Sequence, residues 1–524
     1  MSGPVERTTV DLVATGAPYE RNASVMLLDR IRRSPGRTAL VVLGEDELAY
    51  EQLGERVRRT VALLRAHGVG RGDRVAYAAS NGLEVVEHLA AALHLGAVFV
   101  PLNTRLSAAE LRFIIDDAGA ALVVADAPMA AVIDTDRPSS PRAFLGLSAD
   151  GLPDGWVPVE DATPAEIGPL GPAADTDPDD LAILMYTSGT TGNPKGVMIS
   201  HGNIVATVHN LLLLIPMGPA SGMLAMAPIF HVGAMALVLG ALATGGRVVI
   251  LRAFDPAAVF DALEQQPVTF TFGVPAMLQA MTADPRFASA DLSKVLFMCA
   301  GAPVPEALLS QYLERGAQIT QGYGLTESTA VVSLLESDLA QAKLGSAGIP
   351  YPLTAVQLRD PDGNVIDVPG VDGEIWVRGR NVVAGYWNRP EETAALRDAD
   401  GWLRTGDAGR WDEDGYLYIT DRIKDMLITG GENVYPAEVE KVLAGHPAVA
   451  EVAVIGTPDE TWGEVVTAVV VTRPGATLEL EELQAYARQH LGGYKIPRRL
   501  FTTEALPRNA SGKVLKRELR AELG

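Results

Sequence analysis

Between Arg37 and Asp126, short apolar runs alternate with longer segments in which apolar residues recur at helical spacing. The short runs are typical of buried strands, and the longer segments are typical of amphipathic helices. Strands are expected at residues 39–43, 48–50, 74–78, 98–101 and 121–125, and helices at residues 51–67, 83–95 and 108–118. Because strands and helices alternate, the pattern predicts right-handed crossovers and a mostly parallel sheet.

The pattern weakens between residues 127 and 180, where Pro, Asp, Ala and Gly are frequent, and we interpret this segment as a surface connection. From Asn203 to Phe272 the alternation resumes, which predicts a second βα region of similar size. Beyond Thr354, short apolar runs separated by turn residues predict a small, mainly β subdomain. After Asp421, strand-like and helical segments mix again and predict a compact α+β module of about 100 residues.

A chain of 524 residues is too long for one hydrophobic core, so at least two domains are expected. We predict an α/β fold with a large N-terminal domain over residues 1–421, built from two βα subdomains and the β subdomain. An α+β C-terminal domain is predicted over residues 422–524.

The formal net charge of −22 excludes two classes of partner, because nucleic acid and anionic membrane surfaces would both be repelled. The single cysteine, Cys299, rules out a disulfide framework within the chain, and its apolar neighbours predict a buried structural thiol. No basic segment followed by an apolar core marks the first residues as a secretory signal. These features together favour a cytoplasmic protein.

One stretch resembles a membrane segment, because no charged residue occurs between Lys195 and Arg247. A spanning helix needs roughly 20 unbroken apolar residues, and Pro216, Pro228 and several glycines interrupt this stretch. Buried elements around an apolar pocket are therefore predicted, and no stable membrane association is expected.

The segment Tyr186–Val197, with the sequence YTSGTTGNPKGV, is the strongest candidate for chemistry. Its glycines permit close approach of the backbone to a ligand, its hydroxyls donate hydrogen bonds, and Lys195 supplies a positive charge, so the segment is suited to phosphate. It is not a Walker A loop, because Lys195-Gly196 is followed by β-branched and apolar residues rather than by Ser or Thr opening a helix. A strand–loop–strand hairpin is predicted. An ordinary surface hairpin is the alternative, since the same residues are common in turns.

Further segments follow in a fixed order: Gln321–Ser328 (QGYGLTES), Thr405–Asp407 (TGD), Asp421–Asp425 (DRIKD), Gly430–Pro436 (GGENVYP) and Pro507–Lys513 (PRNASGK). Together with the glycine-rich hairpin, this series resembles the signature of the adenylate-forming superfamily, and especially its acyl-CoA synthetases. The resemblance covers nearly the whole chain, and it implies that ATP, Mg²⁺ and CoA are the cofactors.

The resemblance also implies roles for individual residues. The triphosphate would be held by Thr187, Ser188, Gly189, Thr190, Thr191 and Lys195. Gln321 and Gly322 would lie beside the nucleotide with Tyr323 against adenine, Thr326 would approach the α-phosphate, and Glu327 would bind Mg²⁺. Asp407, helped by Arg422, would hold the ribose hydroxyls, a task for which a carboxylate is well suited.

In the family, the residue that matches Lys424 is the hinge of a mobile C-terminal domain. Rotation about it would bring the loop containing Gly430, Gly431 and Asn433 to the pantetheine channel of CoA. Lys513 resembles the catalytic lysine of the adenylation step. Basic residues dominate between Tyr494 and Arg520, which favours the docking of a polyanion there, although a solvated helix face is the alternative.

The acid itself is expected to be uncharged apart from its carboxylate. The segment Pro228–Met235 resembles the acyl-pocket segment of fatty-acyl and aryl-CoA ligases, with Phe230 and His231 in the pocket. Amino-acid-activating relatives carry an aspartate at the position of His231, and an unpaired ammonium in an apolar pocket would be costly. Gly301, Gly322 and Val331 also fit an apolar tail. A core histidine bonded to backbone is the alternative for His231.

The sequence therefore predicts an AMP-forming acid–thiol ligase that adenylates a fatty or aromatic monocarboxylic acid and transfers the acyl group to CoA. Specialised relatives leave a second possibility, in which the acceptor is a carrier-protein thiol, an amine or a small inorganic nucleophile such as nitrite. A third possibility is a nucleotide-binding scaffold without catalysis. A homodimer is compatible with the sequence but is not indicated by any motif.

Overall fold

The computed structural model describes residues 21–187, 194–301, 304–422, 425–429, 432–459, 462–491, 493–508 and 514–523. The chain divides into two compact units. The first contains Met1–Val356 and Val377–Leu403, and the second contains Gln357–Trp376 and Arg404–Gly524. The predicted domain boundary at residues 421 and 422 and the hinge at Lys424 stay predictions, and Lys424 lies outside the described residues.

The larger sheet of the first unit has the strand order β16-β15-β14-β13-β12-β10-β11-β1-β2. Its strands are β1 (Thr38–Val42), β2 (Glu47–Ala49), β10 (Gly222–Ala225), β11 (Arg247–Ile250), β12 (Phe270–Gly273), β13 (Leu296–Ala300), β14 (Gln318–Tyr323), β15 (Ser333–Leu335) and β16 (Ile349–Pro350). The strands from β1 to β14 along this order run parallel, and antiparallel strands close both edges. Cys299 is buried in β13, and burial raises the pKa of its thiol to about 12, so the predicted structural thiol is confirmed.

A second sheet of the first unit has the order β7-β6-β5-β3-β4-β8-β9 and is parallel except for the β8–β9 hairpin. Its strands are β3 (Arg74–Ala78), β4 (Val98–Pro101), β5 (Leu122–Ala125), β6 (Ala143–Gly146), β7 (Val157–Pro158), β8 (Leu181–Thr187) and β9 (Lys195–Ser200). The two mostly parallel sheets confirm that the chain contains two βα regions, but the strands expected at residues 39–43 and 48–50 lie in the larger sheet and not with β3, β4 and β5.

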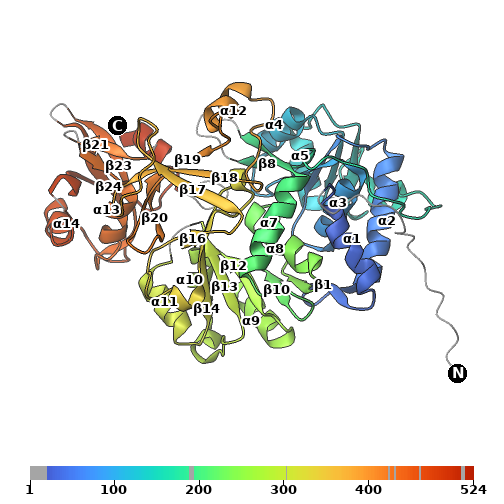
Figure 1. The fold of residues 1–524 in the computed structure, drawn as a ribbon, viewed down its shortest axis with the longest axis horizontal. Helices are drawn as coiled ribbons and strands as arrows, with labels where there is room; N and C mark the ends of the chain where they lie inside the picture. Colours follow the sequence, from blue (N-terminus) through green and yellow to red (C-terminus); the bar gives the residue numbers. More distant parts are fainter. Residues whose placement is uncertain are drawn as a thin grey trace. The chain divides into compact units, whose positions relative to one another are not determined.

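Helices cover these sheets and connect their strands. They are α1 (Ser24–Arg33), α2 (Tyr50–Ala66), α3 (Leu83–Leu95), α4 (Ala108–Ala118), α5 (Ala127–Thr135), α6 (Val159–Ala162), α7 (His201–Leu214), α8 (Val232–Ala243), α9 (Pro256–Gln265), α10 (Pro275–Met281), α11 (Glu306–Leu313) and α12 (Pro390–Leu396). Helices α7 and α8 lie side by side (Figure 1), and α8 packs on β10, β11 and β12 while α7 packs on β9. The pair therefore lies between the two sheets.

The interpretation of residues 127–180 as a surface connection is wrong for its first half. Asp126 caps helix α5, because its Oδ1 accepts a hydrogen bond of 3.1 Å from the amide of Met129. Strand β6 then extends the second sheet parallel to β5, with Phe144 and Leu145 buried. An element of four residues is too short to give a recognisable period, which explains why the sequence pattern missed it.

The second unit contains the predicted β subdomain and α+β module. Strands β17 (Thr354–Arg359), β18 (Gly373–Gly379), β19 (Leu403–Trp411) and β20 (Leu417–Arg422) form one sheet in that order, and the division between the units falls within the first three of them. The second sheet has the order β22-β21-β24-β23, with β25 beside β24. Its elements are β21 (Leu427–Thr429), β22 (Glu432–Val434), β23 (Val449–Asp459), β24 (Gly463–Thr472), β25 (Arg499–Thr502), α13 (Pro436–Leu443), α14 (Leu480–Ala487) and α15 (Lys516–Leu523).

None of the helices in the described ranges combines the length and apolar character that crossing a bilayer requires. The uncharged stretch between Lys195 and Arg247 instead supplies β9, α7, β10 and α8, most of whose residues are buried. The prediction of buried elements is confirmed.

Candidate active site

The glycine-rich segment is part of a hairpin, as the sequence predicts. Strands β8 and β9 are antiparallel, with Tyr186 opposite Gly196 and Thr187 opposite Lys195. A side chain at position 196 would lie 2.9 Å from Leu184 Cδ1 and 3.0 Å from Tyr186 Cζ, so only glycine fits there without a shift. Thr187 and Lys195 thus stand at the two ends of the connecting loop. The other four predicted triphosphate contacts, Ser188, Gly189, Thr190 and Thr191, lie outside the described residues.

Lys195 and Glu327 belong to one cluster, which we call the charged cluster and which comprises Lys195, Glu327, Tyr386 and Glu392. The hydroxyl of Tyr386 donates a hydrogen bond of 2.7 Å to Glu327 Oε1. The ammonium of Lys195 lies 5.4 Å from the centroid of the Tyr386 ring and 3.8 Å from Glu392 Oε1. Two residues that the sequence assigned to phosphate and metal therefore both contact Tyr386, Glu327 at its hydroxyl and Lys195 over its ring.

The carboxyl ends of β13 and β14 carry the predicted nucleotide and acid residues. Gly322 lies opposite Ala300 in the parallel pair, which places Gly301 next to the end of β14, and ligands of open α/β sheets commonly bind at such an edge. Gly301 has φ of 87°, a conformation that favours glycine. Gly322 and Tyr323, at the end of β14, are both half-buried.

Gln321 has a spare donor. Its Oε1 accepts a hydrogen bond of 3.1 Å from the amide of Val304, but its Nε2 is buried and has no partner among the described residues. An unpaired buried donor is costly unless a ligand or water takes it, so this side chain fits the predicted place beside a nucleotide.

Thr326 and Glu327 lie in a short 3₁₀ turn, Thr326–Ser328, that follows β14. Thr329 and Ala330 follow with φ of 49° and 81°, which is sparsely populated backbone for residues other than glycine. A buried amide side chain supports this turn, because Asn381 Nδ2 donates to the carbonyl oxygens of Ser328 and Val331 at 3.0 and 2.7 Å. The turn is thus held in a conformation that its own residues would not prefer.

The carboxylate of Glu327 is a suitable oxygen ligand for Mg²⁺. One carboxylate oxygen is occupied by Tyr386, and the described residues contain no group of three His, Cys, Asp or Glu side chains that could hold a metal ion alone. Mg²⁺ is usually bound through one or two carboxylates with the remaining ligands supplied by phosphates and water. A single carboxylate near the hairpin that is predicted to hold the triphosphate matches that preference.

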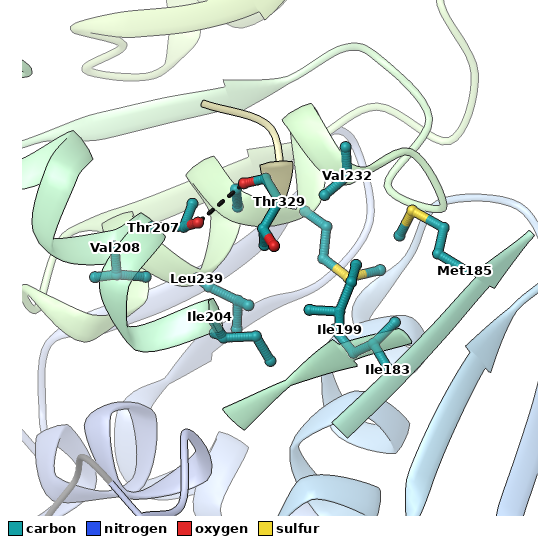
Figure 2. A pocket seen from close by; sticks show the side chains of 11 residues that line it. Ile183, Met185, Ile199, Ile204, Thr207, Val208, Val232, Leu239 and Thr329 are labelled. Carbon is teal, nitrogen blue, oxygen red and sulfur yellow. Dashed lines mark hydrogen bonds between the residues drawn. The ribbon is translucent and has the colours of Figure 1, made fainter. Parts of the chain in front are cut away.

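An apolar pocket with a cavity volume of about 20 Å³ lies between α7, α8 and the β8–β9 hairpin (Figure 2). It is lined by Ile183, Met185, Ile199, Ile204, Thr207, Val208, Val232, Met235, Ala236, Leu239 and Thr329. No charged side chain is among them. Thr207 and Thr329 are the polar members, and Thr207 Oγ1 donates a hydrogen bond of 3.0 Å to the Thr329 carbonyl. The predicted pocket residues Phe230, His231, Gly301, Gly322 and Val331 do not line it, although Val232 directly follows His231.

His231 is the N-cap residue of α8 and is half-buried, with its ring centroid 4.6 Å from that of Phe230. Burial disfavours the imidazolium and, with repulsion from Arg105, lowers the pKa of His231 to about 4. Among the described residues, no hydrogen bond between the backbone and the imidazole contributes to this pKa. The side chain therefore stays neutral near pH 7.

The residues predicted to hold the ribose lie in the second unit. Asp407 and Arg422 are direct backbone partners in the antiparallel pair β19–β20. Asp407 is buried and its amide donates a hydrogen bond of 3.1 Å to Thr405 Oγ1. Asn433 lies in β22. The predicted Gly430, Gly431 and Lys513 lie outside the described residues.

The sequence analysis did not identify Tyr386 or the contacts that hold the residues following it. The Trp387 indole donates to the Asp117 carbonyl at 3.1 Å, Arg389 pairs with the Asp117 carboxylate at 3.0 Å, and the Tyr186 hydroxyl donates to that carboxylate at 2.7 Å. The available signal was the cluster of aromatic and basic residues in Gly385–Arg389. Its contacts are all distant in sequence, so the pattern alone gave them no partner.

Comparison with known proteins places this geometry in a family. The family model described as AMP-binding enzyme matches residues 27–387, and that of the AMP-binding enzyme C-terminal domain matches residues 438–513. The chain belongs to the AMP-binding enzymes. This agrees with the sequence-based resemblance to the adenylate-forming superfamily.

Individual members of this AMP-binding family are similar over nearly their whole length. A feruloyl-CoA synthase of Amycolatopsis is 45% identical over 94% of this chain and 98% of that protein, and a long-chain-fatty-acid–CoA ligase of Mycobacterium tuberculosis is 40% identical over 96% and 98%. The solved structure of o-succinylbenzoate–CoA synthetase from Bacillus subtilis with its acyl-adenylate superposes with a TM-score of 0.85 at 32% identity, over 94% of this chain and 97% of that one.

The predicted enzyme class is confirmed by these relatives. This AMP-binding enzyme is an AMP-forming ligase that joins a carboxylic acid to CoA with ATP and Mg²⁺. The hypothesis of a scaffold without catalysis is set aside.

Proposed function

We propose that the acid activated by this ligase is an apolar monocarboxylic acid, fatty or aromatic, and that its tail enters the apolar pocket. The observation that carries this proposal is the lining of that pocket, which contains no charged side chain. An ammonium or second carboxylate on the acid would lose its hydration there without gaining a partner, which is costly. His231 adds no charge, because its pKa of about 4 keeps it neutral.

The cavity volume of about 20 Å³ is little more than one water molecule needs, so the lining side chains would have to move apart for the tail to enter. Apolar surface buried on binding contributes roughly 25 cal/mol per Å², so affinity should grow with the apolar part of the acid until the space is filled. Single methylene differences should change the specificity constant by about 10-fold or more.

The chemistry proposed for this site has two steps. A carboxylate oxygen attacks the α-phosphorus of ATP, the bond to the bridging oxygen of the β-phosphate breaks, and pyrophosphate leaves the acyl-adenylate behind. The sulfur of CoA then attacks the carbonyl carbon, the thiol proton is released, and AMP leaves as the thioester forms. Such transfers depend mainly on positioning and on neutralising charge.

The chain's own residues would supply both. Thr187–Lys195 would hold the triphosphate, Thr326 would donate to the α-phosphate, and Lys513 would bridge the incoming carboxylate and that phosphate. Glu327 would hold Mg²⁺, which would neutralise phosphate charge. His231 is a poor general base near pH 7, since its pKa of about 4 is far from that pH, so we assign it to packing beside the acid.

After adenylation, the C-terminal domain would rotate about Lys424 and withdraw Lys513. The loop containing Gly430, Gly431 and Asn433 would then line the channel for CoA, while Asp407 and Arg422 hold the ribose. The register that pairs Asp407 with Arg422 supports their shared role.

A panel of acids tests the proposal. Acid-dependent exchange of pyrophosphate into ATP should be seen with a long-chain fatty acid or a hydroxycinnamic acid, and it should be at least about 100-fold weaker with phenylalanine or malonate, given the cost of an unpaired charge. Mass spectrometry with CoA should detect the thioester. Efficient exchange with phenylalanine or malonate would refute the apolar-acid assignment, and an acyl-adenylate that accumulates despite CoA would refute the assigned acceptor.

A further inference from the structure

The backbone around Tyr386 is held in place by hydrogen bonds to strand β9. The segment around it adds to the edge of β9, with Val197 and Tyr386 as bridge partners. On either side, the Met198 amide donates to the Gly385 carbonyl at 3.1 Å, and the Trp387 amide donates to the Gly196 carbonyl at 2.8 Å. The hairpin that carries the glycine-rich loop therefore sets the position of this tyrosine.

A second set of bonds fixes Tyr386 relative to Glu327. The Val383 amide donates to the Glu327 carbonyl at 3.0 Å, so the segment also contacts the turn that holds the carboxylate. Thr393 clamps the tyrosine backbone, because its Oγ1 accepts from the Tyr386 amide at 3.0 Å and donates to the Tyr386 carbonyl at 3.3 Å. The backbone that carries the Tyr386 ring therefore has little conformational freedom.

The side chain of Tyr386 contacts two charged groups, one through its hydroxyl and one through the face of its ring. Its hydroxyl donates to Glu327 Oε1 at 2.7 Å, and its ring face lies 5.4 Å from the Lys195 ammonium, within the range of a cation–π interaction. The hydroxyl and the ring of Tyr386 therefore each contact one charged group, the carboxylate of Glu327 and the ammonium of Lys195.

This arrangement keeps two opposite charges from neutralising each other. Within the described part of the chain, Lys195 pairs with Glu392 at 3.8 Å and not with Glu327. A direct pair between Lys195 and Glu327 would occupy the ammonium and the carboxylate together, because opposite charges attract strongly in a partly buried site. Tyr386 satisfies one oxygen of Glu327, and among the described residues no hydrogen bond is made to the other.

We propose that Tyr386 is a positioning residue for adenylation, which orients Glu327 toward Mg²⁺ and keeps Lys195 available for the triphosphate. The inference rests on the proposed role of Glu327 as the metal ligand. It adds a residue that does not itself touch the substrates but determines how two groups that do so are presented.

Calorimetry of ATP binding to the full chain tests this directly. Tyr386→Phe removes the hydroxyl and keeps the ring, so ATP affinity in the presence of Mg²⁺ should fall about tenfold, as expected for one hydrogen bond to a charged group. Affinity measured in EDTA should change less than about twofold, since the ring face toward Lys195 remains. Tyr312→Phe is the matched control. It removes another buried tyrosine hydroxyl, bonded to the Leu278 carbonyl at 2.8 Å, and should leave both affinities unchanged.

Glu327→Gln separates a failure of this inference from a failure of the proposed function. If Tyr386 acts through Glu327, adding Tyr386→Phe to Glu327→Gln should cost less than about a third of its effect in the parent, because the two changes remove one interaction. Equal effects of Tyr386→Phe in both backgrounds would overturn the positioning role. A normal Mg²⁺ dependence in Glu327→Gln would instead overturn the metal-ligand assignment. An equal loss of ATP affinity in Mg²⁺ and in EDTA for Tyr386→Phe would show a general structural effect and would also overturn the inference.

Discussion

The apolar pocket is enclosed by side chains that differ in shape but not in charge, whereas the charged cluster is held by directed contacts between single groups. In the pocket, the contribution of any one residue scales with the area and volume it fills. In the cluster, the Tyr386 side chain contacts both Glu327 and Lys195, so a change at this one residue affects the interactions of two charged groups. Specificity and catalysis in this ligase should therefore respond differently to substitution.

The largest effect should come from the cluster. Glu327→Gln keeps an acceptor for Tyr386 but removes the negative charge, so the rate of acid-dependent pyrophosphate exchange should fall roughly 100-fold or more, the size typical of a single preorganised electrostatic contact. The unfolding midpoint should change little. Glu336→Gln, at an exposed position nine residues further on, is the control and should leave the rate unchanged. A Glu327→Gln enzyme with the parental rate would show that the charged cluster does not control the rate of adenylation.

The pocket should respond through volume. Leu239 is buried in α8, and Leu239→Ala should lower the free energy of unfolding by roughly 2–5 kcal/mol. The space created should shift the preference among acids toward bulkier tails by about 10-fold in kcat/KM. Leu213→Ala, on the exposed face of α7, should change neither quantity. A drop in the rate for every acid alike, without a change of preference, would count against a pocket that measures size.

The sequence predicted the features that local patterns determine, and it missed the features that depend on long-range contacts. The βα alternation, the β8–β9 hairpin and the second-unit module follow from local periodicity and turn residues, and they were predicted correctly. Strand β6 was missed because four residues give no period. Tyr386 was missed because its partners Lys195 and Glu327 are distant in the chain, and Thr207 was missed because it is one hydroxyl on an apolar helix. Such contacts arise only when the fold brings the segments together.

A smaller effect is expected where the two regions meet. Thr207 Oγ1 donates to the carbonyl of Thr329, in the strained turn between Glu327 and the pocket. Thr207→Val keeps the shape but leaves that buried carbonyl without its donor, so the free energy of unfolding should fall by about 1–3 kcal/mol. Urea unfolding measures the change, and kcat with the preferred acid should stay within about twofold because the charged cluster is intact. A large loss of kcat at unchanged stability would mean that the turn transmits pocket changes to Glu327.

The smallest effect concerns pH. The pKa of His231 is about 4 in the folded protein and about 6.5 in an unfolded chain, so between these values the unfolded state binds more protons. The contribution of His231 to stability is therefore fully present above pH 6.5 and is lost as the pH falls toward 4. His231→Gln should make urea unfolding less sensitive to pH in that window, with no change in the shape of the kcat/KM profile between pH 6.5 and 8. An ionisation near pH 7 that is present in the parent and absent in His231→Gln would show instead that the imidazole takes part in proton transfer, and the apolar pocket would then need a titrating group at its edge.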